Sequence, residues 1–77
     1  MYIKLYRDCF RGMFENTPAI GAIIKEEGKD DVVFYTTFQD ESIECVREAT
    51  AKALRQAKNY AGDVDVLVCA NLTNILE

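Results

Sequence analysis

Histidine is absent from this 77-residue chain, and its three cysteines, Cys9, Cys45 and Cys69, include no Cys-x-x-Cys pair. A structural zinc site is normally built from closely spaced cysteines and histidines, and a disulfide framework needs an even number of cysteines. The sequence therefore predicts neither kind of cross-link. We expect the three cysteines to be buried, reduced thiols.

The chain also lacks a long apolar run. No stretch approaches the ~20 apolar residues of a membrane-spanning helix, and we expect no leader, because no basic segment precedes an apolar one. With one proline, 49% hydrophobic and 29% charged residues, the composition is typical of a folded domain. We expect one small domain, residues 1–77, located in the cytoplasm. A domain of this size buries only about 60% of its unfolded surface, so a partner or a second copy would help to stabilise it.

Basic residues are fewer than acidic ones. Nine Lys and Arg stand against 13 Asp and Glu, which gives a formal net charge of −4. Proteins that bind nucleic acids through phosphates usually carry a surplus of clustered Lys and Arg. We therefore expect no direct binding to nucleic acid.

Three stretches have the composition of strands. Residues 2–10 and 32–38 are rich in β-branched and aromatic side chains, and residues 19–25 are almost unbroken apolar sequence. A loop with glycine and proline over residues 11–18 and a polar turn over residues 27–31 separate them. The pattern predicts a three-stranded antiparallel meander.

From residue 40 the apolar residues recur in steps of three and four, which predicts one buried face of a long helix. This face is expected to comprise Ile43, Val46, Thr50, Ala53, Ala57 and Tyr60. Asp40 is the expected N-cap and Gly62 the expected C′ residue. Acidic side chains come early and basic ones late, as the helix dipole favours.

Residues 64–69 are apolar on both faces, which suits a parallel strand reached by a helical crossover. A right-handed crossover returns this strand beside the first one. Asn71 is expected to cap a short last helix over residues 72–76. The predicted fold is therefore α+β, in the order β-β-β-α-β-α. The meander and the parallel fourth strand form a sheet of order 3-2-1-4, and the long helix packs on one face.

The aromatic residues and Gly21 allow predictions about how the core is packed. Most of the six aromatic residues of the first three strands are expected to serve the core rather than to offer stacking platforms. These six are Tyr2, Tyr6, Phe10, Phe34, Tyr35 and Phe38. Gly21 is expected to mark a place where the helix packs closely on the sheet.

This order of elements, with Asp8 near the end of the first strand and an Arg-Gly pair behind it, resembles the first part of the ribonuclease H fold. The match runs through LYRDCFRG, AIGAII, the TT of FYTTFQ, EATAKALRQA and VDVLVCANL. It covers nearly all of this chain, but about the first half of a typical family member.

Active members of that family hold two Mg²⁺ ions with four carboxylates, and the ions stabilise the attacking and leaving oxygens of a phosphoryl displacement. Asp8 matches the first of the four, although Cys9 replaces the glycine that usually follows it. The helix carboxylate falls on Glu48 in one register and on Val46 in another, and Glu44 lies within the error of either.

The resemblance implies an incomplete metal site. The family's aspartate at strand four falls on Ala70, or on Asn71 if the register slips by one, and the fourth carboxylate has no counterpart. One or two carboxylates cannot hold two hard cations, so we expect no catalytic residues, no metal and no other cofactor. The alternative is a metal-dependent nuclease, or a nuclease subunit, that cleaves RNA–DNA hybrids with Mg²⁺ and uses Asp8 with Glu44 or Glu48.

The resemblance also implies an open edge, because the strand that normally covers the fourth one is missing. The free N–H and C=O groups of such an edge recruit another strand. We expect a homodimer across a two-fold axis, or strand addition by a different protein. The contacts are expected from Val64, Asp65, Val66 and Val68.

Acidic residues gather at the second hairpin, namely Glu26, Glu27, Asp30 and Asp31. The predicted topology places Asp63 and Asp65 toward the same end of the sheet. These carboxylates form either a solvated rim or a docking surface for a basic protein partner.

The leading hypothesis is a non-catalytic protein-interaction module with a truncated ribonuclease H-like fold. One specific form of it is a small acidic inhibitor of a nucleic-acid enzyme, of the phage or mobile-element type that includes anti-CRISPR proteins. A third reading, beside the nuclease, is an assembly subunit that pairs with its own kind.

Overall fold

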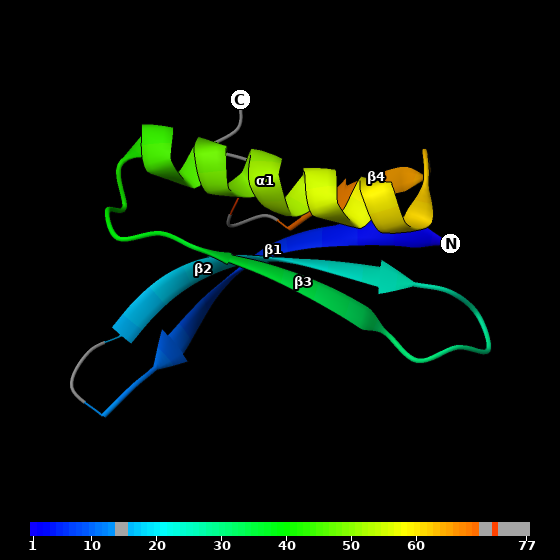
Figure 1. Cartoon of the computed structure of the whole chain (residues 1–77), viewed down its shortest axis with the longest axis horizontal. Helices are drawn as coiled ribbons and strands as arrows, with labels where there is room; N and C mark the ends of the chain where they lie inside the picture. Colours follow the sequence, from blue (N-terminus) through cyan, green and yellow to red (C-terminus); the bar gives the residue numbers. More distant parts are fainter. Residues whose placement is uncertain (14–15, 70–71, 73–77) are drawn as a thin grey trace.

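The computed structural model describes residues 1–13, 16–69 and 72. It consists of a four-stranded sheet with a helix packed across one face (Figure 1). The elements follow the order β1 (Tyr2–Arg11), β2 (Asn16–Lys25), β3 (Val32–Thr37), α1 (Ile43–Ala61) and β4 (Asp65–Val68). The sheet order is β3-β2-β1-β4. β2 pairs antiparallel with β1 and β3, whereas β4 pairs parallel with β1. The predicted α+β class, sheet order and parallel fourth strand are confirmed.

The core lies between the sheet and α1. Along β1, Ile3 and Leu5 are buried and face the helix, as the two-residue period of a strand requires. They join Ile20, Ala22 and Ile24 of β2 and the small residues of α1 in one apolar cluster. Burying a side chain of this size contributes about 1.5–3 kcal/mol relative to its exposed state.

The ends of α1 differ in part from the sequence prediction. The N-cap is Ser42, whose hydroxyl accepts a hydrogen bond from the N–H of Cys45, and not Asp40. Asp40 forms a turn just before the helix instead, because its carboxylate accepts from the N–H of Ser42. Gly62 ends the helix with a φ of 86°, and its N–H bonds the carbonyl of Lys58, as predicted.

The buried face of α1 is shorter than predicted. Val46, Thr50, Ala53 and Ala57 are buried, and Ala49 joins them. Ile43 and Tyr60 are 57% and 62% exposed, because they lie in the first and last turns of the helix. Thr50 is accommodated in the core because its hydroxyl donates to the carbonyl of Val46.

The strands also differ from the prediction at their ends. β2 begins at Asn16, since its pairing with β1 continues past Pro18 to Arg11. Pro18 accepts a hydrogen bond from the N–H of Phe38 but has no N–H to return, and β3 ends beside it at Thr37.

Three further predictions concern the cysteines, the last helix and a membrane span. The cysteines are not buried as predicted: Cys45 and Cys69 are half-buried, and Cys9 is exposed because it lies near the end of β1 beyond the cover of the helix. The last helix over residues 72–76 and its cap Asn71 lie outside the described residues, apart from Leu72, which is buried in the core. Among the described residues, no helix is long and apolar enough to cross a membrane.

Candidate functional site

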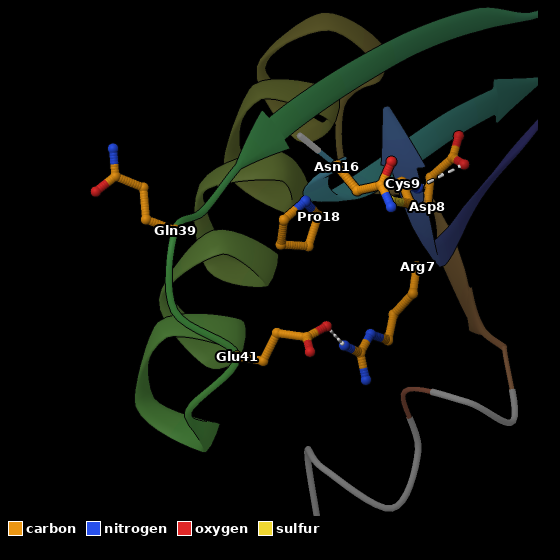
Figure 2. Close-up of a pocket in the computed structure, with 7 residues that line it drawn as sticks. All are labelled: Arg7, Asp8, Cys9, Asn16, Pro18, Gln39 and Glu41. Atoms are coloured by element: carbon orange, nitrogen blue, oxygen red, sulfur yellow. Dashed lines mark hydrogen bonds and ion pairs between the residues drawn. The ribbon is translucent and has the colours of Figure 1, made fainter. Parts of the chain in front are cut away.

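The end of β1 forms one wall of a shallow hollow of about 510 Å³ (Figure 2). Its lining residues are Arg7, Asp8, Cys9, Asn16, Pro18, Gln39 and Glu41. The guanidinium of Arg7 spans the hollow and donates to the carboxylate of Glu41 at 2.9 Å. This ion pair ties the end of β1 to the segment that leads into α1. Because both side chains are partly exposed, it contributes no more than about 1 kcal/mol.

Asp8 points away from Arg7 and Glu41 in Figure 2. Side chains alternate along β1, so Arg7 lies on the helix side of the sheet with Leu5, and Asp8 lies on the opposite face. The carboxylate of Asp8 is exposed and accepts a hydrogen bond from the N–H of Cys9 at 2.8 Å.

That hydrogen bond gives a partner to the N–H of Cys9, which does not bond β2. Cys9 is paired with Pro18, whose carbonyl faces β3, so the N–H of Cys9 points to the other side of β1. β4 reaches only as far as Leu5 on that side, where Val68 is its last paired residue. Asp8 therefore satisfies an amide on the part of the β1 edge that no described strand covers, which is a structural role for a polar residue.

The helix glutamates lie elsewhere. Glu44 and Glu48 are exposed on α1, and Glu48 lines a separate hollow beside β3 together with Thr36 and Lys52. The structure does not bring Asp8 together with either of them, because α1 covers the other face of the sheet. Among residues 1–13, 16–69 and 72, no three His, Cys, Asp or Glu side chains are grouped so that they could hold a metal ion. Ala70 and Asn71 lie outside the described residues.

No described strand pairs with the outer side of β4. The N–H of Cys69 bonds the carbonyl of Leu5, so residues 65, 67 and 69 direct their backbone groups to β1, and Val66 and Val68 direct theirs outward. The N–H of Val64 is taken by the carbonyl of Gly62. Of the predicted contact residues, Val64 and Val66 are half-buried against the core, while Asp65 and Val68 are exposed.

Acidic residues meet at one end of the sheet, as the predicted topology requires. Tyr2 of β1 is paired with Lys25 on one side and with Asp65 on the other. The hairpin between β2 and β3 and the start of β4 therefore lie at the same end. We call this the acidic end; it comprises Glu26, Glu27, Asp30, Asp31, Asp63 and Asp65.

Three of these carboxylates are neutralised by lysines. Lys25 pairs with Asp31 at 3.0 Å, Lys29 with Glu26 at 3.5 Å and Lys58 with Asp63 at 3.9 Å. The hydrogen bond to Asp31, together with its charge, raises the pKa of Lys25. Glu27, Asp30 and Asp65 have no ion pair within the described part of the chain. These three carry the unbalanced charge of the acidic end.

An aromatic cluster on the open face of the sheet was missed by the sequence reasoning. Tyr6 donates to the hydroxyl of Tyr35 at 2.8 Å, and the rings of Phe10 and Tyr35 meet edge to face at 4.8 Å. Phe10 and Tyr35 are each 42% exposed and lie outside the core, whereas Phe34 and Phe38 belong to it, as expected of most of the six aromatic residues. The period-two spacing of Tyr6 and Phe10, out of phase with Ile3 and Leu5, was the signal for a separate face.

The hydroxyl of Tyr6 is the most perturbed acid of the described residues. Burial raises its pKa, and the hydrogen bond with Tyr35, the charge of Tyr35 and the charge of Asp8 act in the same direction. All of these effects oppose a phenolate inside the cluster.

Comparison with known proteins gives no match to a family model, to a curated protein sequence or to a solved structure.

Proposed function

We propose that this chain is a non-catalytic protein-interaction module, and that it binds a protein partner through the β4 edge and the adjacent acidic end. The observation that carries the proposal is the outward direction of the Val66 and Val68 backbone groups beside exposed carboxylates. An extended segment of a partner can pair with that edge, since strand addition needs a row of free N–H and C=O groups. Leu67, 55% exposed, adds apolar contact area on the open face.

The charge of the acidic end defines the partner's chemistry. Asp65 lies on the edge strand itself, and Glu27 and Asp30 stand unpaired across the same end. Complementary charge accelerates association and selects among partners. The partner is therefore a protein with a basic extended segment, and phosphate backbones are repelled.

A basic partner is compatible with a nucleic-acid-binding enzyme, whose substrate channel is lined by Lys and Arg. Inhibition of such an enzyme, as by small acidic inhibitors of phage or mobile-element type, is the specific form of the proposal. We place the chain in the cytoplasm and keep the ribonuclease H-like relationship as part of the proposal, supported by the sheet order β3-β2-β1-β4. The nuclease alternative has no such support, since Asp8 and α1 lie on opposite faces of the sheet.

A synthetic strand-forming peptide tests this proposal. The probe alternates Lys with Val, and a matched peptide alternates Glu with Val. We expect the basic peptide to shift the backbone amide resonances of Val66 and Val68, with an affinity that falls as salt is added. The acidic peptide should shift neither. Binding of both peptides alike, or of neither, contradicts the proposal.

Charge reversal provides the matched variants. Glu27→Lys, Asp30→Lys and Asp65→Lys break no internal ion pair, so the fold should persist. Combined, they should weaken the basic peptide at least about tenfold, the equivalent of 1.4 kcal/mol. Val68→Pro removes one outward N–H and should weaken both the peptide and any cellular partner. A protein captured from cell extract supports the proposal only if both the combined charge reversal and Val68→Pro abolish its binding.

A further inference from the structure

β3 is a second open edge, on the opposite side of the sheet from β4. In the described part of the chain no strand pairs with its outer side. Natural edge strands are usually protected by charge, proline or a bulge. β3 reads VVFYTT over six residues, without charge, proline or glycine, and it pairs with β2 in an unbroken register. β4, in comparison, has four residues and carries Asp65.

The direction of the free groups on β3 follows from one hydrogen bond. The N–H of Phe38 bonds the carbonyl of Pro18 on β2, and backbone direction alternates along an antiparallel strand. Phe34 and Thr36 therefore bond β2, while Val33, Tyr35 and Thr37 direct their N–H and C=O groups away from the sheet. These are three donors and three acceptors in a straight row.

We propose that β3 pairs antiparallel with β3 of a second copy, around a two-fold axis that passes beside Tyr35. In this register Tyr35 faces Tyr35 of the second copy, and Val33 faces Thr37 of the second copy. All six free groups on each chain are then used, since directly opposed residues of this kind exchange both hydrogen bonds. The paired side chains are uncharged, and aromatic and β-branched cross-strand pairs stabilise a sheet.

The free groups of β3 select a second copy as the occupant, because a two-fold axis sets the three donors of one β3 against the three acceptors of the other. The outward row of Val33, Tyr35 and Thr37 carries no charge, so no like charges meet between the paired side chains. Beside this row, α1 presents Glu48 and Lys52, one charge of each sign, over Thr36. This inference stands independently of the partner proposed at β4, which the dimer leaves free.

The position of α1 permits the pairing. The helix packs mainly on β2 and β3 and less on β1. A helix axis above the space between β2 and β3 lies half a strand spacing inside β3, and the two-fold axis lies half a spacing outside it. The two axes are therefore about one strand spacing, roughly 4.8 Å, apart. The two helices of the dimer would be separated by about 10 Å on the same face of an extended sheet, which is the distance at which helices pack. The second copy can thus approach without displacing the helix.

The register is tested by charge pairs in the full chain. Val33→Lys with Thr37→Lys places like charges opposite each other at two positions, and we expect the dimer dissociation constant to rise at least about tenfold in sedimentation velocity. Val33→Lys with Thr37→Glu places opposite charges at the same two positions and should restore the dimer. Both substitutions fall on the open face beside uncharged Ile23 and Ala19 of β2, so the fold should tolerate them.

The control is Leu67→Lys on the β4 side, which should leave self-association unchanged. Amide exchange by NMR gives a second readout: Val33, Tyr35 and Thr37 should become protected as concentration rises, while Phe34 and Thr36 are protected throughout. A wild-type chain that stays monomeric into the millimolar range overturns the inference. A dimer lost in the Leu67→Lys variant but kept in both β3 double variants also overturns it, and assigns the interface to β4.

Discussion

The phenol ring of Tyr6 lies across Gly21 of the neighbouring strand, in the space that a Cβ atom would occupy. The two residues are directly paired between β1 and β2. A Cβ built on Gly21 would lie 2.7 Å from the hydroxyl oxygen of Tyr6 and still closer to its ring. Gly21 thus faces away from α1, which corrects the expectation that it lets the helix approach the sheet. Its lack of a side chain lets Tyr6 reach over to Tyr35.

We predict that Gly21→Ala destabilises the fold, although alanine is intrinsically favoured over glycine in a strand. The new methyl group must push Tyr6 aside and break its hydrogen bond to Tyr35, at a cost of about 1–3 kcal/mol in the free energy of unfolding. Urea denaturation measures this loss. In a Tyr6→Ala background the same substitution should cost nothing, because the ring is gone. If Gly21→Ala lowers the free energy of unfolding equally in the wild type and in Tyr6→Ala, Tyr6 is not the obstacle.

A second prediction concerns high pH. The pKa of Tyr6 is raised in the folded state, so the folded chain holds this proton more tightly than the unfolded chain. The resulting stability is complete below the unfolded pKa near 10, and it is lost as pH rises above that value toward the folded pKa. The free energy of unfolding should therefore fall more steeply with pH above about 10 in the wild type than in Tyr6→Phe.

Difference absorbance between these two proteins isolates the Tyr6 titration. Its midpoint should lie above the ordinary tyrosine range and move down in Tyr35→Phe, which removes the hydrogen-bond partner. A Tyr6 midpoint at its ordinary value would mean that the cluster is open to water.

A third prediction concerns the start of α1. Ser42→Ala should lower the free energy of unfolding by about 1 kcal/mol, because the N–H of Cys45 loses its acceptor. Ser42→Thr retains a hydroxyl and should recover most of this loss. Thermal unfolding followed by circular dichroism measures both variants. If Asp40→Ala proves the more costly substitution and Ser42→Ala is neutral, Asp40 is the functional cap after all.

Period and composition were enough to predict the order of the five elements that the structure describes, and the sheet order. The helical run after residue 40 required a crossover, and the apolar strand after it then had to return beside β1. The exact residues at which helices and strands begin and end were less predictable. Asp40 and Ser42 are both good capping residues, for example, and only the backbone path decides which of them caps α1. Pro18 lies inside β2 and not in the loop before it. β3 ends beside Pro18, because a proline offers no N–H to the neighbouring strand.

The site could be predicted less well than the fold. The resemblance to ribonuclease H identified Asp8 by its place in the sequence, whereas its function depends on which face of β1 it occupies. Ile3 and Leu5 already set that phase, and they assign the helix side to Arg7. The predicted sheet order already placed β3 at an edge, but its own residues gave no sign of that position, because a strand of six uncharged residues is equally typical of the middle of a sheet.

The last prediction concerns Asp8 and metal. With its carboxylate bonded to the N–H of Cys9 and separated by the sheet from Glu44 and Glu48, Asp8 belongs to no group of acidic side chains among the described residues that could hold Mg²⁺. We expect added Mn²⁺ to produce no localised broadening at Asp8 and the two glutamates in NMR spectra. Asp8→Asn keeps an oxygen acceptor for the N–H of Cys9 and should change stability by less than about 0.5 kcal/mol.

An RNA–DNA hybrid assay with Mg²⁺ or Mn²⁺ completes this test, with Asp8→Asn as the matched variant and Asp30→Asn as the control. No cleavage by any of the three proteins is the expected result. Cleavage that disappears only in Asp8→Asn, together with Mn²⁺ broadening at Glu48, would require a second arrangement of α1 against the sheet. Asp8 would then be a metal ligand, and the nuclease hypothesis would replace the interaction module, because a two-metal reaction cannot proceed without that carboxylate.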